Sequence, residues 1–216
     1  MLISKKDKLA ITFKDARYTY EQLLRYSQIY ANKFMEETKP EKVLLCAQNS
    51  PEWCFAFYGA MRCKSIAVPL DSQSTKKEIE YVINDCRPDI VFISDDKKEM
   101  FADINLQGAR LYTKDDFILS DDESIPAVDL PLGGKEDTML INYTSGTTGN
   151  PKGVMLSFKN VMFNVDAVSK SVPIFQEDSN VMVLLPVHHI LPLLGSIVAP
   201  LYMGGTIHIA EAMNAE

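Results

Sequence analysis

The chain has 216 residues, of which 46% are hydrophobic, and this is enough for one large α/β domain with an ordinary buried core. Its formal net charge of −7 argues against nucleic-acid binding as the main role, because nucleic-acid-binding domains carry basic surfaces. The four cysteines form no Cys-x-x-Cys pair, which indicates buried, reduced thiols. No signal peptide is evident, and the longest apolar run, 190–203, is shorter than a membrane span of about 20 residues. We therefore expect a cytoplasmic globular protein without a transmembrane segment.

Strand-like apolar runs alternate with helical patterns through the first half of the chain. After an N-terminal hairpin, Thr19 is placed to cap a helix over about 20–36. A second helix, apolar nearly all round and therefore buried between layers, begins at Pro51, and a third begins at the capping box of Thr75 and Glu78. The strands between them are expected at 43–47, 66–70, 89–94 and 110–113. This alternation favours an α/β fold of mostly parallel sheets with helices on both faces.

The second half begins with a connector at about 120–137, which is acidic, aperiodic and rich in Pro and Gly. We interpret it as a solvated link and not as a site. Beyond it, Ser157 is placed to cap a helix whose apolar residues include Val161, Phe163, Val165 and Val168. The run 190–203 predicts a buried helix, interrupted or kinked near Pro192 and Pro200. Strands are expected at 139–142, 153–156, 181–185 and 206–210.

Between two of these strands lies Tyr143-Thr-Ser-Gly-Thr-Thr-Gly-Asn-Pro-Lys-Gly-Val154. Its glycines permit positive φ, so that backbone N–H groups can turn toward one centre, while hydroxyls add donors and Lys152 adds a mobile positive charge. A Ser/Thr/Gly-rich linker is the alternative, but linkers rarely lie between two strongly apolar β-type runs. The stretch therefore predicts a polyphosphate-binding loop. The predicted phosphate-binding residues are Thr144, Ser145, Gly146, Thr147, Thr148, Gly149 and Lys152.

This loop is not a Walker loop, because Lys152 follows proline and precedes a strand, whereas the Walker lysine precedes Ser or Thr and a helix. Residues 143–153 instead resemble, without a break, the phosphate loop of the adenylate-forming (AMP-dependent) synthetase and ligase superfamily, in its acyl-CoA-synthetase-like form. Similarity to this family extends to 18–23, 58–71, 185–190 and 204–206. One departure is the segment 62–65, Arg-Cys-Lys-Ser, where relatives are usually richer in glycine.

The resemblance implies an enzyme that binds ATP, Mg²⁺ and a carboxylic acid, and makes an acyl-adenylate and pyrophosphate. Most relatives then pass the acyl group to a thiol, often coenzyme A. The loop would hold the charge that builds on the β- and γ-phosphates as they leave, and by resemblance Thr144 would also contact the Mg²⁺. Because the oxygen of the acid makes the attack, the chain needs no catalytic nucleophile, and no serine lies in a Gly-x-Ser-x-Gly context.

The adjacent residues His188 and His189 allow three interpretations. They could bind a metal ion, although no further ligand has suitable spacing, or they could pack and hydrogen-bond at a strand end. The resemblance favours a third, in which they belong to the pocket for the acyl substrate and His189 lines its entrance. His208 lies in a strand pattern and is interpreted as an ordinary surface or core residue.

The identity of the acid is also open between two classes. Amino-acid-activating relatives place an aspartate near the position of His189, but this chain has no acidic residue between Asn180 and Ala210. The apolar run 190–203 fits a fatty acyl chain instead, as in a long-chain-fatty-acid–CoA ligase of fatty acid metabolism. An aminoacyl-adenylating module of peptide synthesis and a non-catalytic nucleotide-binding fragment remain as alternatives.

Some of the parts that the resemblance implies have no counterpart in the sequence. These are a Tyr-Gly-Thr-Glu segment, a ribose-binding aspartate, and a small C-terminal domain with a catalytic lysine. We therefore interpret residues 1–216 as an incomplete N-terminal AMP-binding domain that lacks the C-terminal domain and is not active alone. Uncovered sheet edges of such a domain favour oligomerisation.

Overall fold

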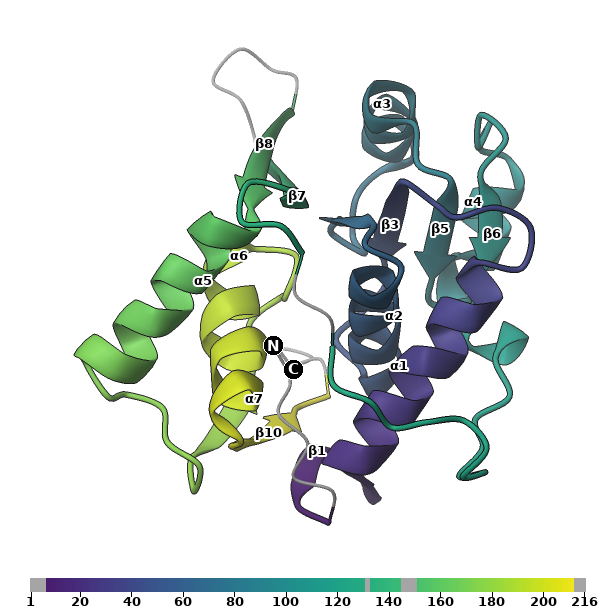
Figure 1. Ribbon diagram of the computed structural model, residues 1–216. Helices are drawn as coiled ribbons and strands as arrows, with labels where there is room; N and C mark the ends of the chain where they lie inside the picture. Colours follow the sequence, from purple (N-terminus) through teal and green to yellow (C-terminus); the bar gives the residue numbers. More distant parts are fainter. Residues whose placement is uncertain (1–6, 131–132, 145–150, 212–216) are drawn as a thin grey trace.

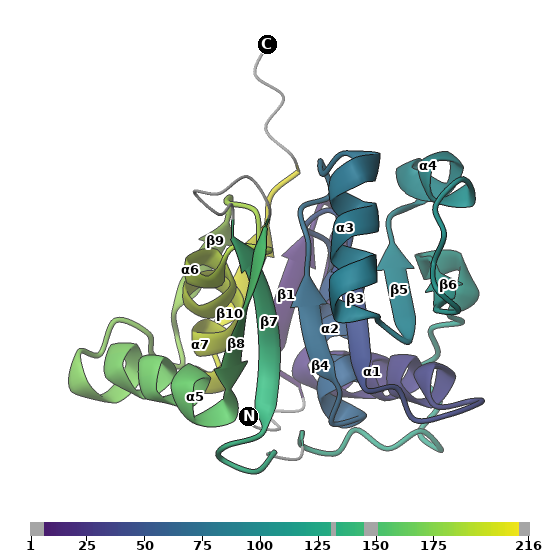
Figure 2. The same ribbon diagram turned by 90° about the horizontal axis from the view of Figure 1, so that it is seen from above.

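The computed structural model describes residues 7–130, 133–144 and 151–211, and the described strands form two sheets (Figures 1 and 2). The strand order is β2-β1-β10-β9 in the four-stranded sheet and β6-β5-β3-β4-β7-β8 in the six-stranded sheet. The strands are β1 (Leu9–Phe13), β2 (Ala16–Thr19), β3 (Lys42–Cys46), β4 (Ile66–Pro69), β5 (Ile90–Ile93), β6 (Arg110–Tyr112), β7 (Thr138–Thr144), β8 (Lys152–Ser157), β9 (Asn180–Val183) and β10 (Thr206–Ile209).

Most neighbouring strands are parallel, as the alternation of strands and helices predicts. In the described part of the chain, the antiparallel pairs are β1 with β2 and β7 with β8. The helices are α1 (Tyr20–Phe34), α2 (Pro51–Arg62), α3 (Lys76–Cys86), α4 (Lys98–Ala102), α5 (Phe158–Asp166), α6 (Ile190–Pro192) and α7 (Ala199–Met203). Short 3₁₀ turns occur at Asp95–Lys97 and Lys114–Asp116.

Helices cover both faces of the six-stranded sheet (Figure 2). Along β3, Val43 and Leu45 face the core that holds α1 and α2, whereas Leu44 and Cys46 face the core under α3 and α4. Burial on both faces explains why this strand is a continuous apolar run and does not alternate with polar residues. The mostly parallel α/β fold with helices on both faces is therefore confirmed.

The predicted helix starts are formed by local capping. The Thr19 hydroxyl accepts from the Gln22 N–H at 3.2 Å, and the Gln22 side chain accepts from the Thr19 N–H at 3.0 Å. Thr75 and Glu78 form the same reciprocal pair at the start of α3, and the two hydrogen bonds from Thr75 lower the pKa of the Glu78 carboxyl. All four cysteines are free and buried, as expected for structural thiols.

Apart from turns, the described residues of the acidic connector have no regular structure, and the connector makes specific contacts with the helices beside it. The Arg25 guanidinium of α1 donates to the carbonyl oxygens of Asp121, at 2.9 Å, and Ile125, at 3.1 Å. Arg62 of α2 donates to the Val128 carbonyl at 2.6 Å, and Leu130 is buried. The described connector residues are thus mostly exposed to solvent, as predicted, and two largely buried arginines in addition bind its backbone to the helical layer.

The run 190–203 forms one helical segment that changes its hydrogen-bonding pattern between the two prolines. A π-helical stretch, Leu193–Val198, separates α6 from α7, and so the interruption predicted from Pro192 and Pro200 is confirmed. The segment is only partly buried, because the Leu191 side chain is 77% exposed. On α5, Val161 and Val165 are buried as predicted, but Phe163 is 74% exposed and is not part of the core. Within the described residues, no helix has the length and apolar character needed to cross a membrane.

Gly59 marks the closest approach of α1 and α2. A Cβ atom at Gly59 would lie 2.8 Å from the Tyr30 Cβ and 3.3 Å from the Ser27 carbonyl oxygen. We expect Gly59→Ala to lower the free energy of unfolding by up to about 2 kcal/mol, because overpacking costs about 1–3 kcal/mol and the gain in helix propensity offsets only roughly 1 kcal/mol of it. Urea unfolding of the chain measures this difference.

Gly195 provides the matched control for this prediction. It also lies in a helical segment, but a Cβ atom there would meet no neighbour within 4 Å. Gly195→Ala is therefore expected to keep or raise the stability. Equal losses in the two variants would contradict a steric role of Gly59.

Candidate functional site

The β7–β8 hairpin carries the predicted phosphate loop. Thr144, the last residue of β7, pairs with Lys152, the first residue of β8, so the two strands end where the loop joins them. Both side chains are exposed. The other predicted loop residues, Ser145, Gly146, Thr147, Thr148 and Gly149, lie outside the described residues. Because β7 is parallel to β4, Thr144 lies at the edge of the sheet where the carboxyl ends of the parallel strands meet.

A hydrogen bond and a close approach of the two strands lie at the loop end of this hairpin. Tyr143 donates its hydroxyl to Asp85 of α3 at 2.5 Å, and burial together with this carboxylate raises the pKa of Tyr143. Across the hairpin, Tyr143 pairs with Gly153, where a Cβ atom would lie 2.8 Å from Ile141 Cγ2. The glycine thus allows the two strands to pack closely. The sequence pattern identified the loop but not the anchor on Asp85, which comes from a distant helix.

A polar pocket of about 290 Å³ lies where the carboxyl ends of strands from both sheets converge. We call it the polar pocket. It is lined by residues that follow β3, β4, β9 and β10. These are Ala47, Gln48, Asn49, Asp71, Ser72, Gln73, Leu184, Pro186, His188, Ala210 and Glu211. This convergence is the usual place of ligand sites in α/β proteins.

The two histidines lie on the turn that follows β9, with ring centroids 4.1 Å apart. His188 lines the polar pocket, and its Nε2 is 3.8 Å from Asp71 Oδ2. Burial lowers the pKa of His188, and the nearby His189 acts in the same direction, whereas the Asp71 carboxylate opposes both. His189 is exposed and immediately precedes α6.

No support for the metal alternative comes from the described residues, because no group of three or more His, Cys, Asp or Glu side chains there could hold a metal ion. His208 has a structural place, as expected for an ordinary strand residue. Its ring bonds Thr12 of β1 at 2.7 Å and Asn180 of β9 at 2.9 Å, and so it links three strands of one sheet.

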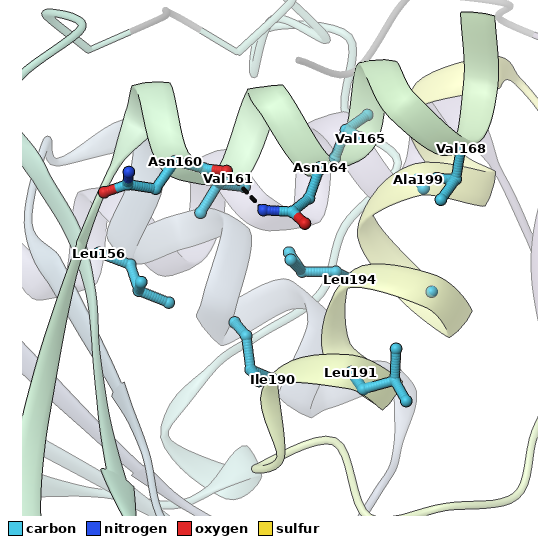
Figure 3. A pocket seen from close by; sticks show the side chains of 11 residues that line it. Leu156, Asn160, Val161, Asn164, Val165, Val168, Ile190, Leu191, Leu194 and Ala199 are labelled. Atoms are coloured by element: carbon cyan, nitrogen blue, oxygen red, sulfur yellow. Dashed lines mark hydrogen bonds between the residues drawn. The ribbon is translucent and has the colours of Figure 1, made fainter. Parts of the chain in front are cut away.

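An apolar groove of about 320 Å³ lies between α5 and the helical segment 190–203 (Figure 3). In Figure 3, the side chains of Leu194 and Ile190 point toward α5, and Leu156 of β8 closes one end. The full lining is Leu156, Asn160, Val161, Asn164, Val165, Val168, Ile190, Leu191, Leu194, Gly195 and Ala199. We call this the apolar groove.

The apolar groove is formed by β8, the helix that begins with α5, and the run 190–203. Of these three segments, the sequence analysis proposed only 190–203 for binding an acyl chain. The two histidines that were predicted for the acyl-substrate pocket do not line the apolar groove. His188 lines the polar pocket, and His189 lies one residue before the groove residue Ile190. The periodicity of α5 placed Val161 and Val165 on an apolar face, but it did not indicate which segment that face would meet. The site therefore combines a phosphate-loop hairpin, a polar pocket and an apolar groove.

Comparisons with known proteins agree with this geometry. Over 192 residues the chain is 28% identical to a long-chain-fatty-acid–CoA ligase of Mycobacterium tuberculosis, covering 83% of this chain and 37% of that protein. Over 180 residues it is 27% identical to bacitracin synthase 2 of Bacillus licheniformis, covering 82% of this chain and 7% of that protein. The crystal structure of ATP-bound MatB from Rhodopseudomonas palustris has a TM-score of 0.85 at 26% identity, covering 98% of this chain and 44% of that one.

The chain thus spans less than half the length of each of these proteins. The family model described as AMP-binding enzyme matches residues 4–215, which is nearly the whole chain. The phosphate-loop sequence and the shared fold point to the same group of proteins. The chain therefore belongs to the AMP-binding enzyme family, the adenylate-forming synthetases and ligases that its loop resembles.

Proposed function

We propose that the protein carrying this chain activates a fatty acid with ATP and then passes the acyl group to coenzyme A. One observation supports this more than any other. The Asn142 side chain of β7 donates to the His188 carbonyl at 2.7 Å, so the hairpin that ends in the phosphate loop contacts the turn that leads into the apolar groove. A triphosphate held by the loop and an acyl chain held in the groove would then meet beside this turn.

In the first step, a carboxylate oxygen of the acid attacks the α-phosphorus of ATP. The new oxygen–phosphorus bond forms the acyl-adenylate as the bond to pyrophosphate breaks. In this proposal the backbone and hydroxyls of the loop bind the β- and γ-phosphates, and the Lys152 ammonium neutralises the charge that develops on the leaving pyrophosphate. The proposed phosphate-binding residues are Thr144, Ser145, Gly146, Thr147, Thr148, Gly149 and Lys152.

A Mg²⁺ ion would neutralise phosphate charge when bound. Such an ion generally needs few protein ligands at a nucleotide site. The Thr144 hydroxyl, exposed at the end of β7, fits this modest demand. We propose that the Thr144 hydroxyl would contact this ion.

The lining of the apolar groove supports a fatty acid as the substrate. Its side chains are aliphatic apart from Asn160 and Asn164, and none carries a charge. The Asn164 amide is already engaged, because its Nδ2 donates to the Asn160 carbonyl at 2.9 Å. Burial of each CH₂ group of an acyl chain here would contribute about 0.8 kcal/mol to binding.

An amino acid is the second candidate, and one observation favours it. Asp71 and Glu211 both line the polar pocket beside His188, so carboxylates from outside 180–210 are available to an ammonium group. The similarity to bacitracin synthase 2 agrees with this alternative.

The test is pyrophosphate release by the protein that carries this chain, with fatty acids of increasing length and with amino acids. We expect release to depend on fatty acids, and Leu191→Glu to raise the KM for a long acid while leaving that for a short acid unchanged. Phe163→Glu is the matched control, because Phe163 is exposed to a similar degree, 74% against 77%, but lies outside the groove.

Two results would contradict the proposal. Release that depends on an amino acid and not on fatty acids would favour the second candidate. Equal effects of the two Glu variants on the KM for the long acid would show that the apolar groove does not bind the acyl chain.

A further inference from the structure

The turn that carries the two histidines has few hydrogen bonds of its own. We call residues 184–189 the histidine turn. Within the turn, the described residues form one backbone hydrogen bond, from the His189 N–H to the Pro186 carbonyl at 3.3 Å. A second backbone hydrogen bond, from the Leu193 N–H to the His189 carbonyl at 3.0 Å, connects the turn to the following helix. Leu184 and Leu185 are exposed, whereas Val187 packs into the hydrophobic core, so one side chain of this segment is anchored by packing. Among the described residues, the remaining hydrogen bonds to its backbone come from the side chains of Asn49 and Asn142. Asn49 follows β3 and Asn142 lies on β7, and both strands belong to the six-stranded sheet.

Asn49 binds the turn through both ends of its amide. Its Nδ2 donates to the Leu185 carbonyl at 2.9 Å, and its Oδ1 accepts from the Val187 N–H at 3.1 Å. Asn49 lies between β3 and α2, next to the helix-capping residue Ser50. It therefore belongs to the short connection that follows β3 of the six-stranded sheet, whereas the turn follows β9 of the four-stranded sheet.

Asn142 holds the turn from the other side. It is only 6% exposed, and its Nδ2 donates to the His188 carbonyl at 2.7 Å. Asn142 lies two residues before Thr144 on β7 and pairs with Val154 of β8, so it belongs to the hairpin that carries the phosphate loop. This hydrogen bond therefore links the hairpin directly to the backbone of His188.

We propose that Asn49 and Asn142 are positioning residues, which fix the histidine turn relative to the phosphate-loop hairpin. The inference rests on the proposed function. Neither asparagine is assigned a contact with a substrate. They set the distance between the phosphates held by the loop and the acid that enters beside His189. A misplacement of about 1 Å between reacting groups costs about a hundredfold in rate, so turnover depends on how these two segments from different sheets are aligned.

The asparagines also place the His188 ring in the polar pocket. The groups that face this ring are Asp71, with its Oδ2 3.8 Å from Nε2, and the ring of His189. Release of the turn would let water reach the His188 ring and so raise its pKa toward the ordinary value, since burial is the main cause that lowers it. This titration is a readout that a general loss of stability would not move.

Three variants separate the contacts. Asn49→Asp keeps the acceptor for the Val187 N–H but removes the donor to Leu185, whereas Asn49→Ala removes both. Asn142→Leu keeps a similar volume in a buried position and removes the donor to His188. The matched control is Asn84→Ala, because the exposed Asn84 side chain of α3 bonds only Gln107 among the described residues.

The first experiment uses the chain itself. We expect Asn49→Ala to speed hydrogen exchange at the Val187 amide and Asn49→Asp to do so less, because the acceptor remains. In an NMR titration, Asn142→Leu should raise the pKa of His188. Unchanged Val187 exchange in Asn49→Ala, or an unchanged His188 titration in Asn142→Leu, would overturn the proposal.

The second experiment measures pyrophosphate release by the protein that carries this chain. Asn142→Leu is expected to lower kcat by about tenfold or more with a change of less than about twofold in the KM for ATP, because alignment and not binding is lost. A kcat equal to that of Asn84→Ala would contradict the positioning role. If the unmutated protein releases no pyrophosphate with any acid, the proposed function fails, while Val187 exchange and the His188 titration still decide whether the asparagines hold the turn.

Discussion

Replacement of Lys152 with alanine is expected to slow pyrophosphate release by the protein that carries this chain by about ten- to a hundredfold. A hydrogen bond to a charged group contributes about 1.5–3 kcal/mol, and the contact with the leaving phosphates strengthens in the transition state. Lys152 is the exposed first residue of β8, so its removal leaves no buried group unpaired. The melting temperature should therefore stay close to that of the unmutated protein.

Lys159→Ala is the matched control for this prediction. Lys159 is also an exposed lysine, and it pairs with the exposed carboxylate of Glu136 at 3.1 Å, a surface ion pair that contributes little to stability. We expect this variant to change neither the rate nor the melting temperature appreciably. A Lys152→Ala variant that melts at a much lower temperature and keeps its rate would refute the phosphate contact.

Local signals in the sequence predict most of the secondary structure. Thr19, Ser50, Thr75 and Ser157 each begin a helix, because a side-chain oxygen that accepts from a backbone N–H satisfies a helix end within four residues of sequence. The loop motif likewise lies in one continuous stretch. Such features depend on neighbours along the chain, and so they can be predicted without knowledge of the tertiary fold.

The parts of the site that the sequence did not reveal depend on residues far apart in the chain. The bond from Asn142 to the His188 carbonyl joins residues 46 positions apart, and Asn49 contacts residues more than 130 positions away. No periodicity records such pairings. The exposure of Phe163 could not be predicted from the sequence either, because its apolar side chain is typical of a core residue. It is exposed because it does not lie on the face of α5 that carries Val161 and Val165 into the groove.

Arg62 lies in the segment 62–65, where the sequence departs from the pattern that the family resemblance predicts. Its side chain reaches from α2 to α1 and to the acidic connector. It donates to Ser27 Oγ at 2.8 Å, to the Leu24 carbonyl at 3.0 Å and to the Val128 carbonyl at 2.6 Å. Burial lowers its pKa to about 10, so the group stays charged at neutral pH. A buried charge that is fully hydrogen-bonded orders the segments that bind it.

We therefore expect Arg62→Ala to lower the free energy of unfolding of the chain by about 2–4 kcal/mol, because it removes several hydrogen bonds to a charged donor and leaves buried acceptors unpaired. The effect should be largest at the connector, where the Val128 carbonyl loses its partner, so limited proteolysis between 120 and 130 should become faster. Urea unfolding measures the global change.

Two further variants serve as comparisons. Arg62→Met keeps the apolar stem, so its loss of unfolding free energy should be smaller than that of Arg62→Ala. Arg17→Ala, at an exposed position, should alter the stability by less than about 0.5 kcal/mol. If Arg62→Ala and Arg17→Ala unfold at the same urea concentration, Arg62 does not hold the connector against the helices.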